Sequence, residues 1–339
     1  MNHPLQFHAP GGFYINDSLS ITSLSYSMKT CWLLIALCAS PVLFAQHKTD
    51  SIITKTSLQE TLAVLASDSL EGRLTGTIGA EKAAYFIADK MMRAGLTPLP
   101  GTTGWFDSFP VPGQGKKTVG LNVIGFLPAS WQIDSSIIFS AHYDHLGKGK
   151  NLTYMEPPDK EDEIYNGAND NATGVAAILE LAKYYAANTH NRYNLVFIAF
   201  SGEEMGLVGS TAYAKKLKSK TVKAAINLEM LGRPTNERCY IVALGNHHLR
   251  KQLNTTLGKF NGNPAEKFFG ADTYSEEQLE YRSDHYPLSR KIKTAFTIMG
   301  TSPADDYYHS VDDEFGTIDF DFLLKATRNI ALACEYFTR

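Results

Sequence analysis

Hydrophobic residues recur along the chain in two alternating patterns. Short, nearly continuous apolar runs predict buried strands over 119–126, 137–141, 195–200, 224–228, 240–244 and 294–299. Apolar residues at helical spacing predict helices over 58–66, 78–94, 175–185, 249–260 and 322–336, and another through Tyr213 to Leu217. This alternation favours an α/β fold, with a central mixed, mostly parallel sheet covered by helices on both faces.

Two stretches lack either pattern. Residues 67–77 are rich in Gly, Ser and Thr, and the next helix is expected to stop at Gly95. Residues 98–115 are dense in Pro and Gly, so we expect them to be irregular. The chain contains no repeat and no long low-complexity linker. One catalytic domain over 46–339 is therefore the simplest organisation.

The N-terminal segment 1–45 has a different character. An apolar run over 31–45 follows Met28 and Lys29, and Ala45 supplies a small residue before Gln46. This is the organisation of a secretory signal peptide that starts at Met28, with 1–27 as an upstream extension. We expect cleavage near Ala45 and export to the periplasm or the extracellular space, with no stable membrane span afterwards.

Two alternatives to this leader remain open. The run can act as an uncleaved anchor, although it is short for a membrane span. Cys38 raises the possibility of a lipoprotein, but Leu37 directly before it is bulkier than the small residue usual there. We therefore favour cleavage over both alternatives.

Composition and charge narrow the range of partners. The 339 residues are 44% hydrophobic and 20% charged, with a net charge of −3, as in ordinary globular proteins. A balance so close to neutral gives no reason to expect a nucleic-acid partner. Outside the leader, Cys239 and Cys334 either pair or stay free. The oligomeric state is left open.

Histidines and carboxylates follow several of the predicted strands. Strand 137–141 leads into His142-Tyr-Asp-His145, strand 195–200 into Glu203-Glu204, and strand 224–228 into Glu229. The last strand leads through a loop to Tyr308 and His309. Ligands in open α/β sheets bind beyond the carboxyl ends of the strands, so this repeated placement indicates a site.

Each of these residues also has a simpler interpretation. Glu203 and Glu204 can form a solvated acidic loop, and Glu229 can be a surface acid. Asp170, within Gly167-Ala-Asn-Asp-Asn-Ala-Thr-Gly174, can be a helix cap or turn residue. His145 is expected to be structural or exposed. Asp144 lies two residues from His142, so on an extended backbone the two face one side and Asp144 can orient the imidazole.

The ordered set of motifs resembles a known family. His-x-Asp, Gly-Ala-x-Asp-Asn-Ala-x-Gly, Glu-Glu and Tyr-His-Ser occur in the order seen in the secreted dizinc aminopeptidases of the bacterial leucyl-aminopeptidase type. Glutamate carboxypeptidases and glutaminyl cyclases are relatives of that family. The resemblance covers nearly all of 55–330, including Leu70-Glu-Gly-Arg-Leu-Thr-Gly76 and Ser283-Asp-His. It implies a single zinc-exopeptidase-like domain.

The resemblance also implies two zinc ions per chain and a role for each matching residue. His142 would bind one zinc, Asp170 would bridge both, and Glu204 and His309 would bind the other. Glu229 would complete the first site. The remaining matches concern catalysis: Glu203 is the general base, Tyr308 polarises the substrate carbonyl, and Asp144 orients the first histidine ligand.

Two positions depart from the family pattern. The family usually has Asp where this chain has Glu229, and we expect Glu229 to ligate because both carboxylates bind zinc at similar distances. Residues 290–293 read Arg-Lys-Ile-Lys where members often carry Gly-Ile-Pro. The second departure concerns loop geometry more than chemistry.

The leading hypothesis is a zinc aminopeptidase that acts on peptides with a free N-terminus. A dizinc-activated water would lose its proton to Glu203 and attack the scissile carbonyl. A glutaminyl-cyclase-like transferase with one zinc and a non-catalytic domain that retains the fold are the alternatives. Side-chain specificity is not predicted, although residues 155–163 form either a solvated acidic loop or an acidic rim near the substrate amine.

Overall fold

The computed structural model describes most of the chain after residue 47. The described residues are 48–113, 118–150, 161–188, 190–243, 247–263, 265, 267–302 and 304–339. The predicted signal peptide, Met28 and Cys38 lie outside them, as does most of the acidic stretch 155–163. In the described part, no helix is both long and apolar enough to cross a membrane.

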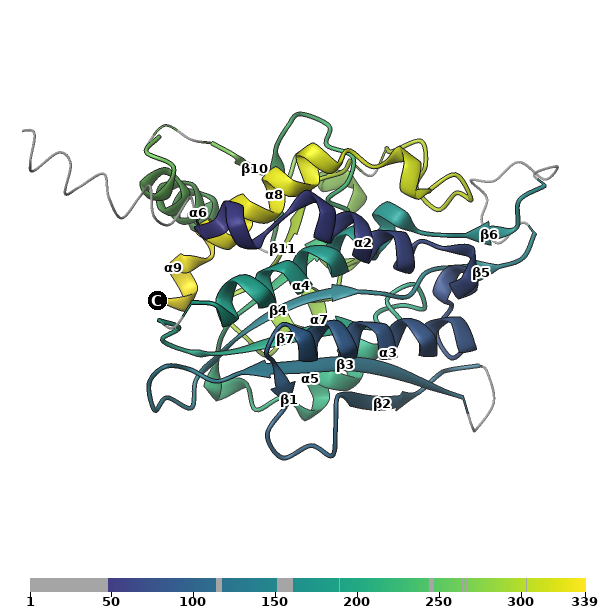
Figure 1. Cartoon of the computed structure of the whole chain (residues 1–339), viewed down its shortest axis with the longest axis horizontal. Helices are drawn as coiled ribbons and strands as arrows, with labels where there is room; N and C mark the ends of the chain where they lie inside the picture. Colours follow the sequence, from purple (N-terminus) through teal and green to yellow (C-terminus); the bar gives the residue numbers. More distant parts are fainter. Residues whose placement is uncertain are drawn as a thin grey trace, which may run out of the picture.

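A nine-stranded mixed sheet forms the centre of the described structure (Figure 1). Its order is β1-β3-β7-β4-β8-β11-β9-β10, with β2 paired to β3 at the β1 edge. The strands in this order are β1 (Thr97–Pro98), β3 (Val119–Leu127), β7 (Asn194–Phe200), β4 (Ser136–His142), β8 (Val222–Glu229), β11 (Ala295–Met299), β9 (Cys239–Val242) and β10 (Phe269–Ala271), followed by β2 (Phe106–Pro110). A separate two-stranded sheet pairs β5 (Gly147–Lys148) with β6 (Ile164–Tyr165).

The inner strands β7, β4, β8 and β11 run parallel to one another. Antiparallel pairs flank them on both sides, at β3–β7 and at β11–β9. Alternate residues of the inner strands enter two different cores: Phe139 and Phe197 face one, whereas Ile138 and Ile198 face the other. Burial on both faces explains why these strands appear as continuous apolar runs in the sequence.

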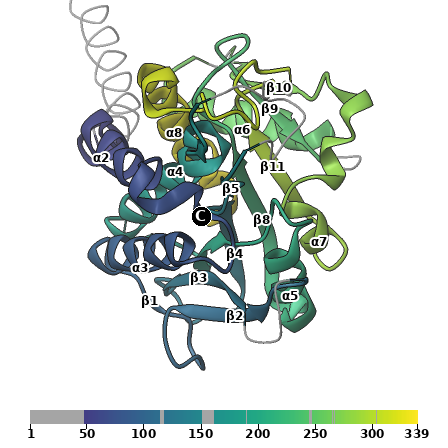
Figure 2. The same ribbon diagram turned by 90° about the vertical axis from the view of Figure 1, so that its right-hand side faces the viewer.

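Helices cover both faces of the sheet (Figure 2). On the face of the larger core lie α2 (Lys55–Leu65), α3 (Ile78–Arg93), α4 (Thr173–Ala186) and α8 (Phe320–Ala333), with α6 (His247–Phe260) packed on α8 and β10. On the opposite face lie α5 (Val208–Lys216) and α7 (His285–Ser289). The chain ends in α9 (Glu335–Thr338). The expected α/β architecture is confirmed.

Side-chain caps define the beginnings of several helices. Thr54 accepts a hydrogen bond from Ser57 N at the start of α2, and Thr77 accepts one from Ala80 N at the start of α3. Asp319 caps α8 in the same way. Each cap satisfies an amide that the first turn of the helix leaves without a partner. These helices therefore begin within a few residues of the predicted positions.

The expectation of irregular structure over 98–115 is wrong in part. Phe106–Pro110 forms β2, which pairs antiparallel with β3, because Phe109 is buried and packs against Gly120. A Cβ atom at Gly120 would lie 2.2 Å from Phe109 Cζ, so the glycine leaves room for the ring. Pro110 is tolerated because it stands at the end of an edge strand.

Several short elements have no clear hydrophobic periodicity in the sequence and were not predicted. They include α7, β10 and the 3₁₀ helices η1 (Asp68–Arg73), η3 (Ser219–Thr221), η4 (Ser275–Glu277), η5 (Leu279–Tyr281) and η6 (Phe315–Thr317). Cys239 and Cys334 are both buried and free.

Candidate metal centre

The four parallel inner strands end at one edge of the sheet, where they place the predicted site residues. His142 is the last residue of β4, and Glu229 is the last residue of β8. Glu203 and Glu204 follow β7, and the loop after β11 leads to Tyr308 and His309. With Asp144 and Asp170, all eight predicted residues gather at this edge.

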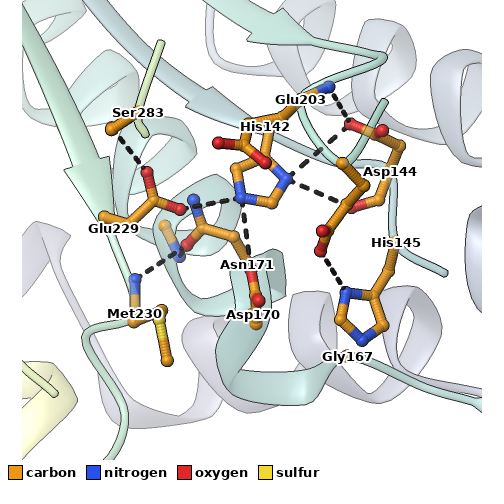
Figure 3. A network of polar contacts seen from close by, with 12 residues as sticks. His142, Asp144, His145, Gly167, Asp170, Asn171, Glu203, Glu229, Met230 and Ser283 are labelled. Carbon is orange, nitrogen blue, oxygen red and sulfur yellow. Dashed lines mark hydrogen bonds and ion pairs between the residues drawn. The ribbon is translucent and has the colours of Figure 1, made fainter. Parts of the chain in front are cut away.

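One group of possible ligands surrounds the Nε2 atom of His142 (Figure 3). This nitrogen lies 2.7 Å from Oε1 of Glu229 and 3.2 Å from Oδ1 of Asp170. All three side chains are buried, and their ligand atoms lie within 4.8 Å of one another. Ser283 Oγ and Asn227 Nδ2 donate to the other oxygen of Glu229 at 2.8 Å and 3.1 Å, which fixes that carboxylate in place.

A second group shares Asp170 with the first. Nε2 of His309 lies 3.4 Å from Oδ2 of Asp170 and 3.1 Å from Oε2 of Glu204. Nδ1 of His145 lies 2.7 Å from the other oxygen of Glu204, so His145 also offers a nitrogen to this group. We expected His145 to be structural or exposed, and it is fully buried at the centre itself.

The electrostatics of the two groups suit a divalent cation. Burial alone lowers the pKa of His309, but the carboxylates of Asp170 and Glu204 outweigh it and raise that pKa to about 10. The pKa of His142 is likewise raised well above its ordinary value against the effect of burial, chiefly by Glu229 and Glu203. In both cases, the nearby carboxylates stabilise a positive charge beside them. Imidazole and carboxylate are ligands of zinc, so the residues fit that metal.

Asp170 is held in place through backbone amides, which bind the side chain of Asp313. Its amide donates to Oδ2 of Asp313 at 3.0 Å, and the amide of Asn169 donates to Oδ1 of the same residue at 2.9 Å. The helix α4 begins at Thr173, and no side-chain cap is present there. The interpretation of Asp170 as a helix cap is therefore wrong, and its carboxylate points to the histidines instead.

The glycine-rich loop around Asp170 approaches β8 closely. Asn171 accepts a hydrogen bond from Met230 N at 3.0 Å and donates to Leu228 O at 2.9 Å. A Cβ atom at Gly174 would lie 2.6 Å from Leu228 O. Only a glycine allows this approach, which sets Asp170 beside Glu229.

Asp144 lies behind His142 and touches several parts of the site. Nδ1 of His142 is 3.1 Å from the backbone oxygen of Asp144 and 3.7 Å from its Oδ1. The same carboxylate accepts from Glu203 N at 3.2 Å and from Thr75 Oγ1 at 3.0 Å. Asp144 is therefore placed to fix the backbone of Glu203 as well as the ring of His142.

Glu203 and Tyr308 line a cavity of about 740 Å³ that opens over both groups. Burial raises the pKa of Glu203 well above its usual range; the positive charge of His142 opposes this, and the charges of Glu204 and Glu229 add to it. Burial also raises the pKa of Tyr308, so its hydroxyl stays protonated near neutral pH. The Tyr308 ring stacks on His309 with centroids 3.9 Å apart.

Arg73, within the Leu70–Gly76 segment, braces the loops beneath the centre. Its guanidinium is fully buried and donates to four backbone oxygens, those of Leu65, Tyr143, Asn166 and Gly167. Three of these oxygens, on Tyr143, Asn166 and Gly167, lie close in sequence to His142 or Asp170. A buried arginine bound to carbonyl groups has no sequence signature, so its role was not predicted.

Comparisons with known proteins identify the family. Residues 122–334 match the family model described as Peptidase family M28. The chain is 28% identical over 221 residues to a probable leucine aminopeptidase of Trichophyton verrucosum, covering 60% of this chain and 54% of that protein. It is 30% identical over 218 residues to aminopeptidase YwaD of Bacillus subtilis, covering 60% of this chain and 42% of that protein.

Solved structures show the same fold. A zinc aminopeptidase of Bacillus subtilis matches with a TM-score of 0.64 at 17% identity, over 85% of this chain and 95% of that one. Glutaminyl cyclase of Porphyromonas gingivalis matches with a TM-score of 0.66 at 15% identity, over 85% of this chain and 99% of that one. The family model and the solved structures agree on the family and the fold. The chain belongs to peptidase family M28, although it spans only about half the length, or less, of the two aminopeptidases matched by sequence.

Proposed function

We propose that this chain is a zinc-dependent aminopeptidase that hydrolyses the N-terminal peptide bond of peptides with a free N-terminus. The observation that carries this proposal is the pair of ligand groups that share Asp170, with Glu203 beside both in one cavity. We further propose two zinc ions per chain. His142, Asp170 and Glu229 hold the first, and Asp170, Glu204 and His309 hold the second, with His145 positioning Glu204.

Zinc in such a site supplies Lewis acidity toward water and toward a carbonyl group. Glu203 takes the proton from the attacking water and returns it to the leaving amine. Burial raises the pKa of the Glu203 carboxyl, which makes it a stronger base than an exposed glutamate and so suits it to this role. The Tyr308 hydroxyl donates to the carbonyl oxygen as negative charge develops there.

Arg282 supports Tyr308 in this role. Its Nη2 lies 3.2 Å from the tyrosine hydroxyl oxygen and donates to it. That contact turns the hydroxyl proton away from the arginine and leaves it free for a substrate oxygen.

The names of the sequence relatives support the same activity. Both proteins reported above are called aminopeptidases, and others of similar identity are called probable zinc metalloproteases. We also propose that the chain is exported. The support is the apolar run 31–45, with Ala45 before Gln46 and one catalytic domain over 46–339.

A substrate screen with the zinc-loaded protein tests the proposal. Leucine p-nitroanilide should be hydrolysed, N-acetyl-leucine p-nitroanilide should not, and a chelator should abolish the activity until zinc is restored. Equal cleavage of the blocked substrate would remove the aminopeptidase claim. Cyclisation of an N-terminal glutamine with one tightly bound zinc would favour the transferase alternative, and complete inactivity at full zinc loading would favour the non-catalytic one.

A further inference from the structure

The cavity over the metal centre is lined by charged side chains of both signs. Its acidic lining residues in the described structure are four, and all of them belong to the centre: Asp170, Glu203, Glu204 and Glu229. Its lysine and arginine lining residues are also four: Lys215, Arg282, Arg290 and Lys291. We call these four cations the basic wall.

Most of the basic wall comes from helices on the sheet face opposite the larger core. Lys215 lies in the last turn of α5, and Arg290 and Lys291 directly follow α7. The two helices pack against each other, so these three side chains come from adjoining backbone. Arg282 follows η5 and reaches Tyr308 at the metal end.

Three members of the basic wall have no acidic partner in the described part of the chain. No ion pair is formed there by Lys215, Arg290 or Lys291, and all three are exposed to solvent at the cavity. The neighbouring Lys216, by contrast, pairs with Asp107 at 2.6 Å and does not line the cavity. The positive charge of the basic wall is thus left to attract a ligand.

The cavity surface also includes apolar and aromatic groups, among them Leu207, Leu279, Tyr281 and Tyr286. Such a surface favours a substrate with an aliphatic or aromatic body. A substrate amide bound at the metal centre can then extend an anionic end toward the basic wall. Arginine in particular binds carboxylate through two parallel hydrogen bonds.

We propose that this cavity selects peptides that carry a carboxylate a short distance from the scissile bond, and that Arg290, Lys291 and Lys215 bind it. The proposal rests on the proposed peptidase function and names its substrate class. Two sources give this chemistry: the C-terminal carboxylate of a dipeptide, or the acidic side chain of an N-terminal Glu or Asp. The experiment below distinguishes them.

The test compares matched substrates on the wild-type protein, the double variant Arg290→Gln/Lys291→Gln, and the control Lys293→Gln. Lys293 is exposed, lies two residues further along and does not line the cavity. Leu-Leu against Leu-Leu-amide reports on the C-terminal carboxylate. Glutamyl p-nitroanilide against glutaminyl p-nitroanilide reports on the side chain.

At low salt, we expect kcat/KM to favour the carboxylate member of one pair by about tenfold or more, mainly through KM. The double variant should lose that preference and keep its rate on the neutral member, whereas Lys293→Gln should keep both. A preference of less than twofold in both pairs, or one unchanged in the double variant, would overturn the proposal. If neutral substrates are still hydrolysed in that case, the proposed peptidase function is unaffected.

If no substrate is hydrolysed, binding to the zinc-loaded protein can be measured by calorimetry instead. Tighter binding of Leu-Leu than of Leu-Leu-amide, or of glutamate amide than of glutamine amide, should disappear in the double variant. Equal binding within both pairs would overturn the basic wall as a carboxylate site. Absence of turnover with selective binding would instead contradict the peptidase function alone.

Discussion

The Nε2 atom of His142 lies 2.7 Å from Oε1 of Glu229, on the side of the ring that faces Asp170. Glu229 therefore reaches the position at which the resemblance to the dizinc aminopeptidases places an aspartate. Its second oxygen is held by Ser283 and Asn227, so the longer side chain is anchored as well as extended. The departure from the family pattern preserves a carboxylate oxygen at this place.

Replacement of Glu229 by Gln should weaken the first zinc site selectively. The amide keeps the shape of the side chain but loses its negative charge. We expect zinc affinity at this site to fall by at least about tenfold, which is the smallest typical effect of removing a residue that only supports a metal ligand. Zinc per chain after dialysis against a weak chelator, measured by mass spectrometry, should fall from two to one. Glu237→Gln, at an exposed glutamate, is the control. Two tightly held zinc ions in Glu229→Gln would show that Glu229 is not a ligand.

The sequence predicted the elements and site residues that have a local or periodic signal. The inner strands are buried on both faces and appear as apolar runs, and their carboxyl ends converge because they are parallel. Residues directly after those runs, such as His142 and Glu229, could therefore be assigned to one edge.

The remaining features depend on contacts between distant segments. Asp313 holds the backbone of Asp170 from 143 positions away, and Arg73 binds carbonyl groups of three separate segments. Nothing local pairs His145 with Glu204, 59 positions later, so the sequence alone predicts a structural or exposed residue there. β2 was missed because the Pro and Gly residues around it obscure Phe109, whose burial depends on β3.

Arg73 should contribute strongly to stability. Arg73→Ala would remove the charged donor of four buried carbonyl oxygens, of which Gly167 O also accepts from Ala172 N. We expect a loss of about 3–5 kcal/mol in the free energy of unfolding, because several buried acceptors lose a charged donor at once. Urea denaturation measures this loss. Arg93→Ala removes an exposed arginine of α3 and should leave the unfolding midpoint unchanged. An equally small effect of Arg73→Ala would contradict the bracing role.

His285 should make the protein less stable as the pH falls. Burial lowers its pKa from 6.5 to about 3, so below pH 6.5 the unfolded chain binds a proton that the folded chain does not. Stability is fully present above pH 6.5 and declines toward pH 3. Between pH 7.5 and 5.5 this one group should cost about 1.4 kcal/mol.

Denaturation of metal-free wild type and His285→Gln at the two pH values isolates this contribution. His285 bonds Thr297 through Nδ1 at 2.8 Å, so the variant is expected to be less stable at both pH values. Its loss between pH 7.5 and 5.5 should nevertheless be smaller than that of the wild type by about 1.4 kcal/mol. Equal losses would show that His285 titrates normally in the folded protein.

Glu203 is proposed to move the proton while its neighbours hold zinc. The most direct test measures zinc content and leucine p-nitroanilide turnover in Glu203→Gln, with the exposed Glu60→Gln as control. We predict unchanged zinc content and a fall in kcat of about 10²–10⁴-fold, the typical contribution of a general base. Full turnover at full zinc loading would show that Glu203 is not the general base.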